Sequence, residues 1–211
     1  GSYVGGDITA GAFASMIWNK EEFSLFIDLG TNAEMVLVKG NDAYITSAAA
    51  GPAFETCSYG HATDAVDGLV HMLESDVLDE TGLLSDEYFD VGYNCNNMFF
   101  SQKKIRDFQM AKSAIRTGID LLIQSIEDLS TDSISVYIAG TFGANLSIKN
   151  AIRLGMLPAW FEGKTSSLGN TSLAGTLEDN PDYLIFKKNI REIVLANLPD
   201  FNEYYINNMN F

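Results

Sequence analysis

Residues 23–47 read FSLFIDLGTNAEMVLVKGNDAYITS, and this stretch decides the fold. Two short apolar, β-rich runs follow one another at 23–28 and 34–39, and a third follows at 43–47. The breaks between them are Gly30-Thr31-Asn32 and Gly40-Asn41-Asp42, which are typical turn sequences. Strands separated by short glycine turns predict an antiparallel three-stranded meander.

Helical periodicity dominates the rest of the chain. The longest periodic segment, about 103–127, has apolar residues at helical spacing that only Lys112 interrupts. A β-rich run at 134–139 predicts one further buried strand, and 76–100 has no clear period. Further helices are predicted at about 61–75, 142–154, 171–178, 183–197 and 200–208. The order predicts an α/β fold in which helices pack on a mixed sheet.

Composition excludes several classes of protein. The 211 residues are 46% hydrophobic and 19% charged, which is typical of a globular chain. A net charge of −15 argues against nucleic acid and anionic membranes as partners, and no apolar run approaches the ~20 residues that span a bilayer. Two distant cysteines, Cys57 and Cys95, do not form a disulfide framework or a zinc motif. We therefore expect a cytoplasmic protein.

The first candidate site is the turn after the first strand. Asp28 ends that strand and is followed by Leu29-Gly30-Thr31-Asn32. Glycine lets a ligand approach the main chain, whose N–H groups can bind phosphate, while the carboxylate can hold Mg²⁺ or orient a water. Glu34 stands just beyond the turn, where it could reach the metal through water.

A second candidate site follows the strand at 134–139. Gly140-Thr141-Phe142-Gly143 lies between that strand and a predicted helix. Glycines at such a turn admit a flat ligand to the main chain, and the start of a helix adds positive potential. Each loop alone has a plain alternative as an ordinary turn.

Taken together, the two loops resemble those of the ATPase superfamily that includes acetate and sugar kinases, heat-shock chaperones and actin. Six segments narrow the resemblance to the C-terminal domain of the reductive activators of corrinoid proteins. In chain order they are FIDLGTNAEMVL, SAAAGPAFE, KKIRDFQMAKSAIRTGIDLL, VYIAGTFGANL, AIRLGMLP and GNTSLAG. The resemblance implies a ribonuclease-H-like, actin-like half domain that carries the second phosphate loop and the adenosine loop.

The same resemblance implies roles for the candidate residues. Asp28 and Thr31 would be catalytic, and Asp28 and Glu34 would serve Mg²⁺. The remaining candidates would bind ATP: Gly30, Asn32, Lys112, Arg116, Gly140, Thr141, Phe142 and Gly143. Lys112 and Arg116 lie one turn apart on the long helix, where they could line the adenine and ribose. In such activators ATP drives electron transfer from an iron–sulfur centre to the cobalt of a corrinoid protein.

Departures from the family pattern leave alternatives open. The DxGT sequence occurs once although an actin-like ATPase needs two similar halves, and the four clustered cysteines of the family's [2Fe–2S] domain are missing. Ala33 and Thr141 stand where the family usually has glycine. We therefore expect a fragment: a cleaved-tag remnant, loop and connecting helix at 1–20, and one subdomain at 21–211.

Two rival interpretations remain. One is a partner-docking domain with a degenerate nucleotide site. The other is an iron–sulfur activator of acyl-CoA dehydratases, which Cys57 and Cys95 invite, although that family's cysteine-centred motifs are absent. The expected partner is a corrinoid protein, and a homodimer is an open alternative. We also expect this chain alone to bind ATP weakly, because one wall of the nucleotide cleft would be missing.

Overall fold

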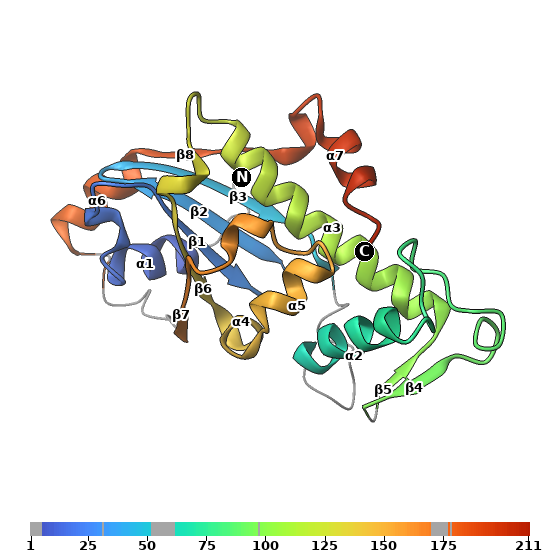
Figure 1. Ribbon diagram of the computed structural model, residues 1–211. Helices are drawn as coiled ribbons and strands as arrows, with labels where there is room; N and C mark the ends of the chain where they lie inside the picture. The colour runs from blue at the N-terminus through green and yellow to red at the C-terminus, as the bar shows by residue number, and fades with distance from the viewer. Residues whose placement is uncertain (1–5, 31, 52–61, 97, 170–176, 178) are drawn as a thin grey trace.

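A six-stranded sheet forms the centre of the molecule (Figure 1). The computed structural model describes residues 6–30, 32–51, 62–96, 98–169, 177 and 179–211. In spatial order the strands are β7 (Thr165–Gly169), β6 (Ser135–Ala139), β1 (Ser24–Leu29), β2 (Ala33–Lys39), β3 (Asp42–Ala48) and β8 (Ile190–Glu192). β2 is antiparallel to both of its neighbours, and the other pairings in this sheet are parallel.

The predicted meander is confirmed. β1, β2 and β3 pair in sequence order, and the two-residue turn between β2 and β3 begins at Gly40, whose φ of +57° suits glycine. The strand predicted at 134–139 is β6, which lies parallel to β1 in the same sheet. The α/β fold with an antiparallel meander is therefore confirmed.

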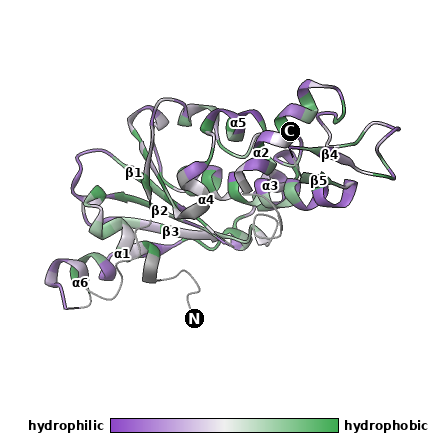
Figure 2. Ribbon diagram, turned by 90° about the horizontal axis from the view of Figure 1, so that it is seen from below, coloured by the Kyte–Doolittle hydropathy of each residue, from purple (hydrophilic) through white to green (hydrophobic). Residues whose placement is uncertain are grey.

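Helices cover both faces of the sheet. They are α1 (Gly6–Ala14), α2 (Ala62–Glu74), α3 (Gln102–Gln124), α4 (Gly140–Asn145), α5 (Ile148–Arg153), α6 (Pro181–Lys188) and α7 (Phe201–Asn207). Leu25 and Ile27 point to the side of α2, α3 and α5, whereas Phe26 points to the side of α1 and α6. Each face thus has its own core, and Figure 2 shows hydrophobic colour along the strands with hydrophilic colour on α6.

The long helix α3 crosses from the sheet to a smaller unit. It begins at Ser101, whose side chain accepts a hydrogen bond from the Lys104 amide at 3.3 Å. It packs on β2 and β3, while its first turns lie near the hairpin of β4 (Tyr93–Cys95) and β5 (Met98–Phe100) (Figure 1). This hairpin falls in the stretch that showed no clear period.

Three sequence predictions need correction. The helix expected at 142–154 is two helices, because Leu146 is extended and Ser147 caps α5 by accepting from the Asn150 amide. The helix expected at 183–197 ends at Lys188, and β8 follows it along the edge of β3. β7 was not predicted. Of the helix expected at 171–178, all but Leu177 lies outside the described residues.

Candidate functional site

The turn after β1 lies at the edge of the sheet where β1 and β6 both end. Asp28 pairs with Ala139, the last residue of β6, so the two glycine loops leave neighbouring strands side by side. Within the first loop the Gly30 amide donates to the Asn32 carbonyl at 3.2 Å, and both residues are exposed. Thr31, the predicted catalytic hydroxyl, lies outside the described residues.

Gly140 brings the second loop against the first. Its φ is +87°, and a Cβ atom there would lie 2.5 Å from Asp28 Oδ1 and 2.8 Å from the Leu29 carbonyl oxygen. No side chain fits in that space. The close contact between the two loops therefore depends on glycine at this position.

The remaining residues of the second loop lie in α4. A Cβ atom on Gly143 would meet Ile138 Cγ2 at 2.3 Å, so this glycine lets the helix pack on the end of β6. Thr141 and Phe142 belong to α4, but their side chains lie outside the described part of the structure. Their predicted contacts with adenosine remain predictions.

Two carboxylates face each other across the meander. Asp28 pairs directly with Glu34, and Glu34 pairs with Ser47 on β3. Directly paired residues share a face of a sheet, so these three side chains form a half-buried polar row on the side of α1. Opposed like charges are unfavourable unless something compensates them, and oxygen ligands of this kind suit Mg²⁺.

Sequence reasoning missed Ser47. The signal that could have found it is the register of the predicted meander, which places residues 28, 34 and 47 in one row when the strands pair through tight turns. A serine hydroxyl there adds a neutral oxygen beside the two carboxylates.

Lys112 and Arg116 contact a different part of the molecule. Lys112 is fully buried, and its Nζ donates to the Asn210 carbonyl and lies 5.2 Å from the centre of the Phe211 ring. Arg116 Nε donates to both oxygens of Asp120 at 3.1 and 3.0 Å. The described contacts of these cations are thus with the C-terminal segment and with α3 itself, and their role at adenine and ribose remains a prediction.

Within the described residues we find no second candidate for a metal site and no candidate for a membrane-spanning helix. No group of three or more potential metal-ligating side chains occurs among them, and no helix among them is both long and apolar enough to span a bilayer. Cys95 is buried near the Gly68 carbonyl, and burial raises the pKa of its thiol. Cys57 lies outside the described residues, so a cluster shared by the two cysteines is not tested.

Comparison with known proteins gives consistent matches. A family model described as the C-terminal domain of RACo, the ASKHA domain, matches residues 22–84 and 86–211. The corrinoid activation enzyme RamQ of Eubacterium limosum is 27% identical over 279 aligned residues, which include all of this chain and 46% of RamQ.

A solved structure agrees with these sequence matches. It is described as a reductive activator for a corrinoid, iron–sulfur protein, and it superposes with a TM-score of 0.82 at 24% identity. The match covers 99% of this chain and 43% of that structure, and at this identity it establishes the fold. The chain therefore spans less than half the length of each of these two relatives.

Proposed function

We propose, on the premise that this chain belongs to the family of the C-terminal ASKHA domains of RACo, that it forms one wall of a Mg-ATP site in a corrinoid activator. The longer protein would use ATP to drive electrons from an iron–sulfur centre to the cobalt of a corrinoid protein. The observation that carries the proposal is the contact between the two glycine loops, where Gly140 lies against the carboxylate of Asp28.

The residues at this edge fit a magnesium nucleotide. Asp28 and Glu34 would hold Mg²⁺ directly or through water, because they pair directly across β1 and β2 and Mg²⁺ prefers oxygen ligands. The main chain at Gly30 and Asn32, with the Thr31 hydroxyl, would bind the phosphates. Bound Mg-ATP supplies the phosphoryl group and the free energy that an uphill electron transfer requires.

The adenosine would lie along the second loop. Gly140 and Gly143 hold this loop against Asp28 and Ile138, and Thr141 and Phe142 would line the base or ribose. Lys112 would contribute from α3 only if the C-terminal segment that now contacts it moved aside, and Arg116 would contribute only if it left its ion pair with Asp120. The [2Fe–2S] cluster belongs, in this proposal, to a separate N-terminal domain.

The names of the relatives support the choice of partner. RamQ is a corrinoid activation enzyme, and the solved relative is a reductive activator for a corrinoid, iron–sulfur protein. We therefore propose a corrinoid protein as the partner. A homodimer and a cytoplasmic location remain part of the proposal.

Titration of the longer protein with ATP in the presence and absence of Mg²⁺ tests the nucleotide site. We expect Mg²⁺-dependent binding that Asp28→Asn weakens about 10-fold or more, in the range that loss of a supporting group at a metal site produces. Asp42→Asn is the matched control, because Asp42 lies in the same meander but is exposed. It forms a long, exposed ion pair with Arg191, at 3.9 Å, whose loss should have little effect. The affinity of this control variant should equal that of the wild type.

Two outcomes would count against the proposal. Absence of any ATP binding by the longer protein would favour the partner-docking alternative, which the single DxGT sequence supports. If Asp28→Asn left Mg²⁺-dependent ATP binding unchanged, Asp28 would not be part of the nucleotide site. ATP-dependent reduction of a purified corrinoid protein, followed by its visible absorbance, tests the electron-transfer step separately.

A further inference from the structure

The helix α3 carries a buried polar stripe. Gln109, Lys112, Ser113 and Thr117 are all fully buried, and their spacing of three or four residues places them along one side of the helix. Buried polar groups are costly unless they are hydrogen-bonded. The segment that covers this stripe must therefore supply hydrogen-bond partners for these side chains.

The cover is the C-terminal end of the chain, residues 201–211, which we call the strap. After β8 the chain leaves the edge of the sheet, and α7 packs along α3 (Figure 1). The strap ends at Phe211, whose amide donates to the Glu80 carbonyl at 2.9 Å. The strap therefore packs on α3 through α7 and reaches the loop at 79–82 with its last residue.

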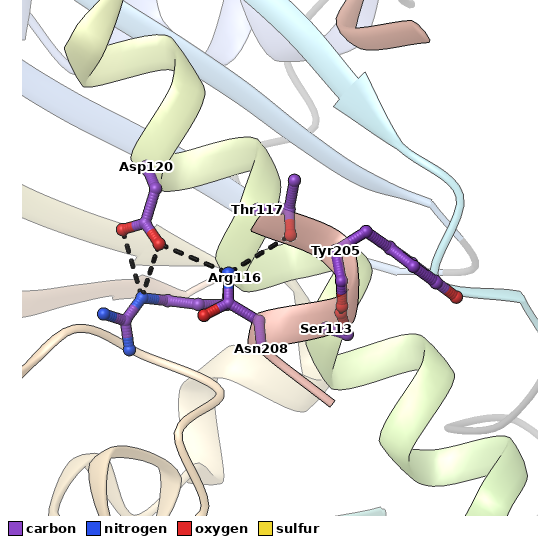
Figure 3. A network of polar contacts seen from close by, with 6 residues as sticks. All are labelled: Ser113, Arg116, Thr117, Asp120, Tyr205 and Asn208. Atoms are coloured by element: carbon purple, nitrogen blue, oxygen red, sulfur yellow. Dashed lines mark hydrogen bonds and ion pairs between the residues drawn. The ribbon is translucent and has the colours of Figure 1, made fainter. Parts of the chain in front are cut away.

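Side chains of the stripe bind the main chain of the strap. Ser113 Oγ donates to the Tyr205 carbonyl, and Lys112 Nζ donates to the Asn210 carbonyl. At the far end, Asn208 Nδ2 donates to Thr117 Oγ1 at 3.2 Å. The same amide donates to Asp120 Oδ2 at 3.4 Å, beside the ion pair of Asp120 with Arg116 (Figure 3).

Gln109 joins the strap to the loop at 79–82. Its Nε2 donates both to the Met209 carbonyl at 3.1 Å and to the Thr81 carbonyl at 3.0 Å. Its Oε1 accepts from Arg106 at 2.6 Å, and Gly82 lies so close that a Cβ atom there would approach Gln109 Nε2 to 2.3 Å. One amide therefore holds two segments that are distant in sequence.

The strap packs on the core through partly buried aromatic side chains, those of Phe201, Tyr204, Tyr205 and Phe211, and none of them is fully buried. No residue between 196 and 211, all of which the structure describes, is buried, and Ile206 is 69% exposed. Hydrogen bonds of the kind seen here each contribute only about 0.5–1.5 kcal/mol. Segments with few buried apolar contacts open at lower free energy than the core.

We propose that the strap is a releasable latch that opens together with the loop at 79–82, with Gln109 and the bond between the Phe211 amide and the Glu80 carbonyl coupling the two. Opening would expose the polar stripe of α3 and would release the loop from the strap and from Gln109, while Arg106 and Gln102 still bind the loop to α3. The proposal does not depend on nucleotide binding.

The charge of Lys112 favours opening at lower pH. Burial lowers its pKa from 10.5 to about 7, helped by the positive charge of Arg116 and opposed by Glu80, which itself pairs with Arg153 at 2.7 Å. In an open latch the amine would meet water and regain its ordinary pKa. Between these two values opening takes up a proton, so the closed state gains stability as the pH rises from about 7 to about 10.

Hydrogen–deuterium exchange of the 211-residue chain tests the coupling. The readouts are peptides from 201–211 and 79–84, with β1 and β2 as the reference for global unfolding. Ser113→Ala removes a bond to the strap alone, yet it should accelerate exchange in both segments about threefold to tenfold. The control is Ser125→Ala, because the Ser125 hydroxyl donates to Leu122 within α3.

The pH arm uses the same measurement. After correction for intrinsic exchange, the opening constant should fall up to about tenfold per pH unit between about pH 7 and pH 10. Lys112→Met should flatten this profile, whereas Lys103→Met, at a lysine that is 83% exposed on the same helix, should not. A flat wild-type profile would contradict exposure of the amine on opening.

Two other outcomes would overturn the latch. The first is acceleration by Ser113→Ala that is confined to 201–211, which would show that the loop is not coupled to the strap. The second is exchange of the strap at the rate of β1 and β2, which would show that it opens only when the whole chain unfolds. Gln109→Leu gives an independent check, because it removes the two Gln109 bonds and should reduce the acceleration that Ser113→Ala transmits from the strap to the loop.

Discussion

At Gly140 one methyl group is expected to disturb the candidate nucleotide site. Gly140→Ala would combine a left-handed main chain, at φ +87°, with a Cβ atom that overlaps Asp28 Oδ1 because it would lie only 2.5 Å from it. The strain alone costs about 1–3 kcal/mol, and the overlap moves the carboxylate away from its place opposite Glu34. We expect a lower free energy of unfolding for the chain, measured in urea, and weaker Mg-ATP binding by the longer protein.

Gly163→Ala is the matched control for that variant. Gly163 also has a left-handed main chain, at φ +73°, but a Cβ atom there meets nothing within 4 Å. The control should show the strain without the steric overlap, and it should leave nucleotide binding unchanged. Equal losses of stability and of binding in the two variants would contradict the role assigned to the contact with Asp28.

At the scale of elements, Gly118 decides how closely α3 approaches the meander. A Cβ atom there would lie 3.0 Å from Met35 Cε and 3.3 Å from Ala48 Cβ, so a larger side chain must push the helix or the strands. We expect Gly118→Val to lower the free energy of unfolding by about 1–3 kcal/mol, as overpacking of a core does. Urea denaturation monitored by circular dichroism measures this change.

A double variant tests whether overpacking causes the loss, because helix propensity alone would favour valine over glycine. Met35→Ala removes the flexible side chain nearest to Gly118, so the pair Gly118→Val and Met35→Ala should destabilise less than the sum of the single changes. Strict additivity would contradict overpacking against Met35 as the cause of the effect of Gly118→Val.

At the scale of the whole molecule, the chain offers one wall of the proposed cleft. Charge-assisted hydrogen bonds to a triphosphate contribute ~1.5–3 kcal/mol each, so the loss of three would weaken binding by about a thousandfold or more. The net charge of −15 adds repulsion towards a polyanion. We expect millimolar or weaker binding of Mg-ATP to this chain by calorimetry, and much tighter binding to the longer protein. Micromolar affinity for the monomeric chain would contradict the two-walled site.

Features that depend on local sequence were predictable. β1 to β3 and α3 follow from periodicity and turn residues, and the order of the two glycine loops follows from the strands that precede them. Local signals failed where context outweighs propensity. β8 forms in a segment predicted to be helical because the open edge of β3 pairs with it, and Ser147 divides the helix expected at 142–154.

Local sequence was enough to predict the meander, the long helix, the α/β class and the order of the two glycine loops, because each depends on residues close together in the chain. The row of Asp28, Glu34 and Ser47 and the contact of Gly140 with Asp28 depend instead on how the strands pair and pack. The same is true of the contact of Lys112, since its carbonyl partner, Asn210, lies 98 residues further along the chain. A side chain's partner across such a separation is set by how the elements pack, and no local pattern encodes it.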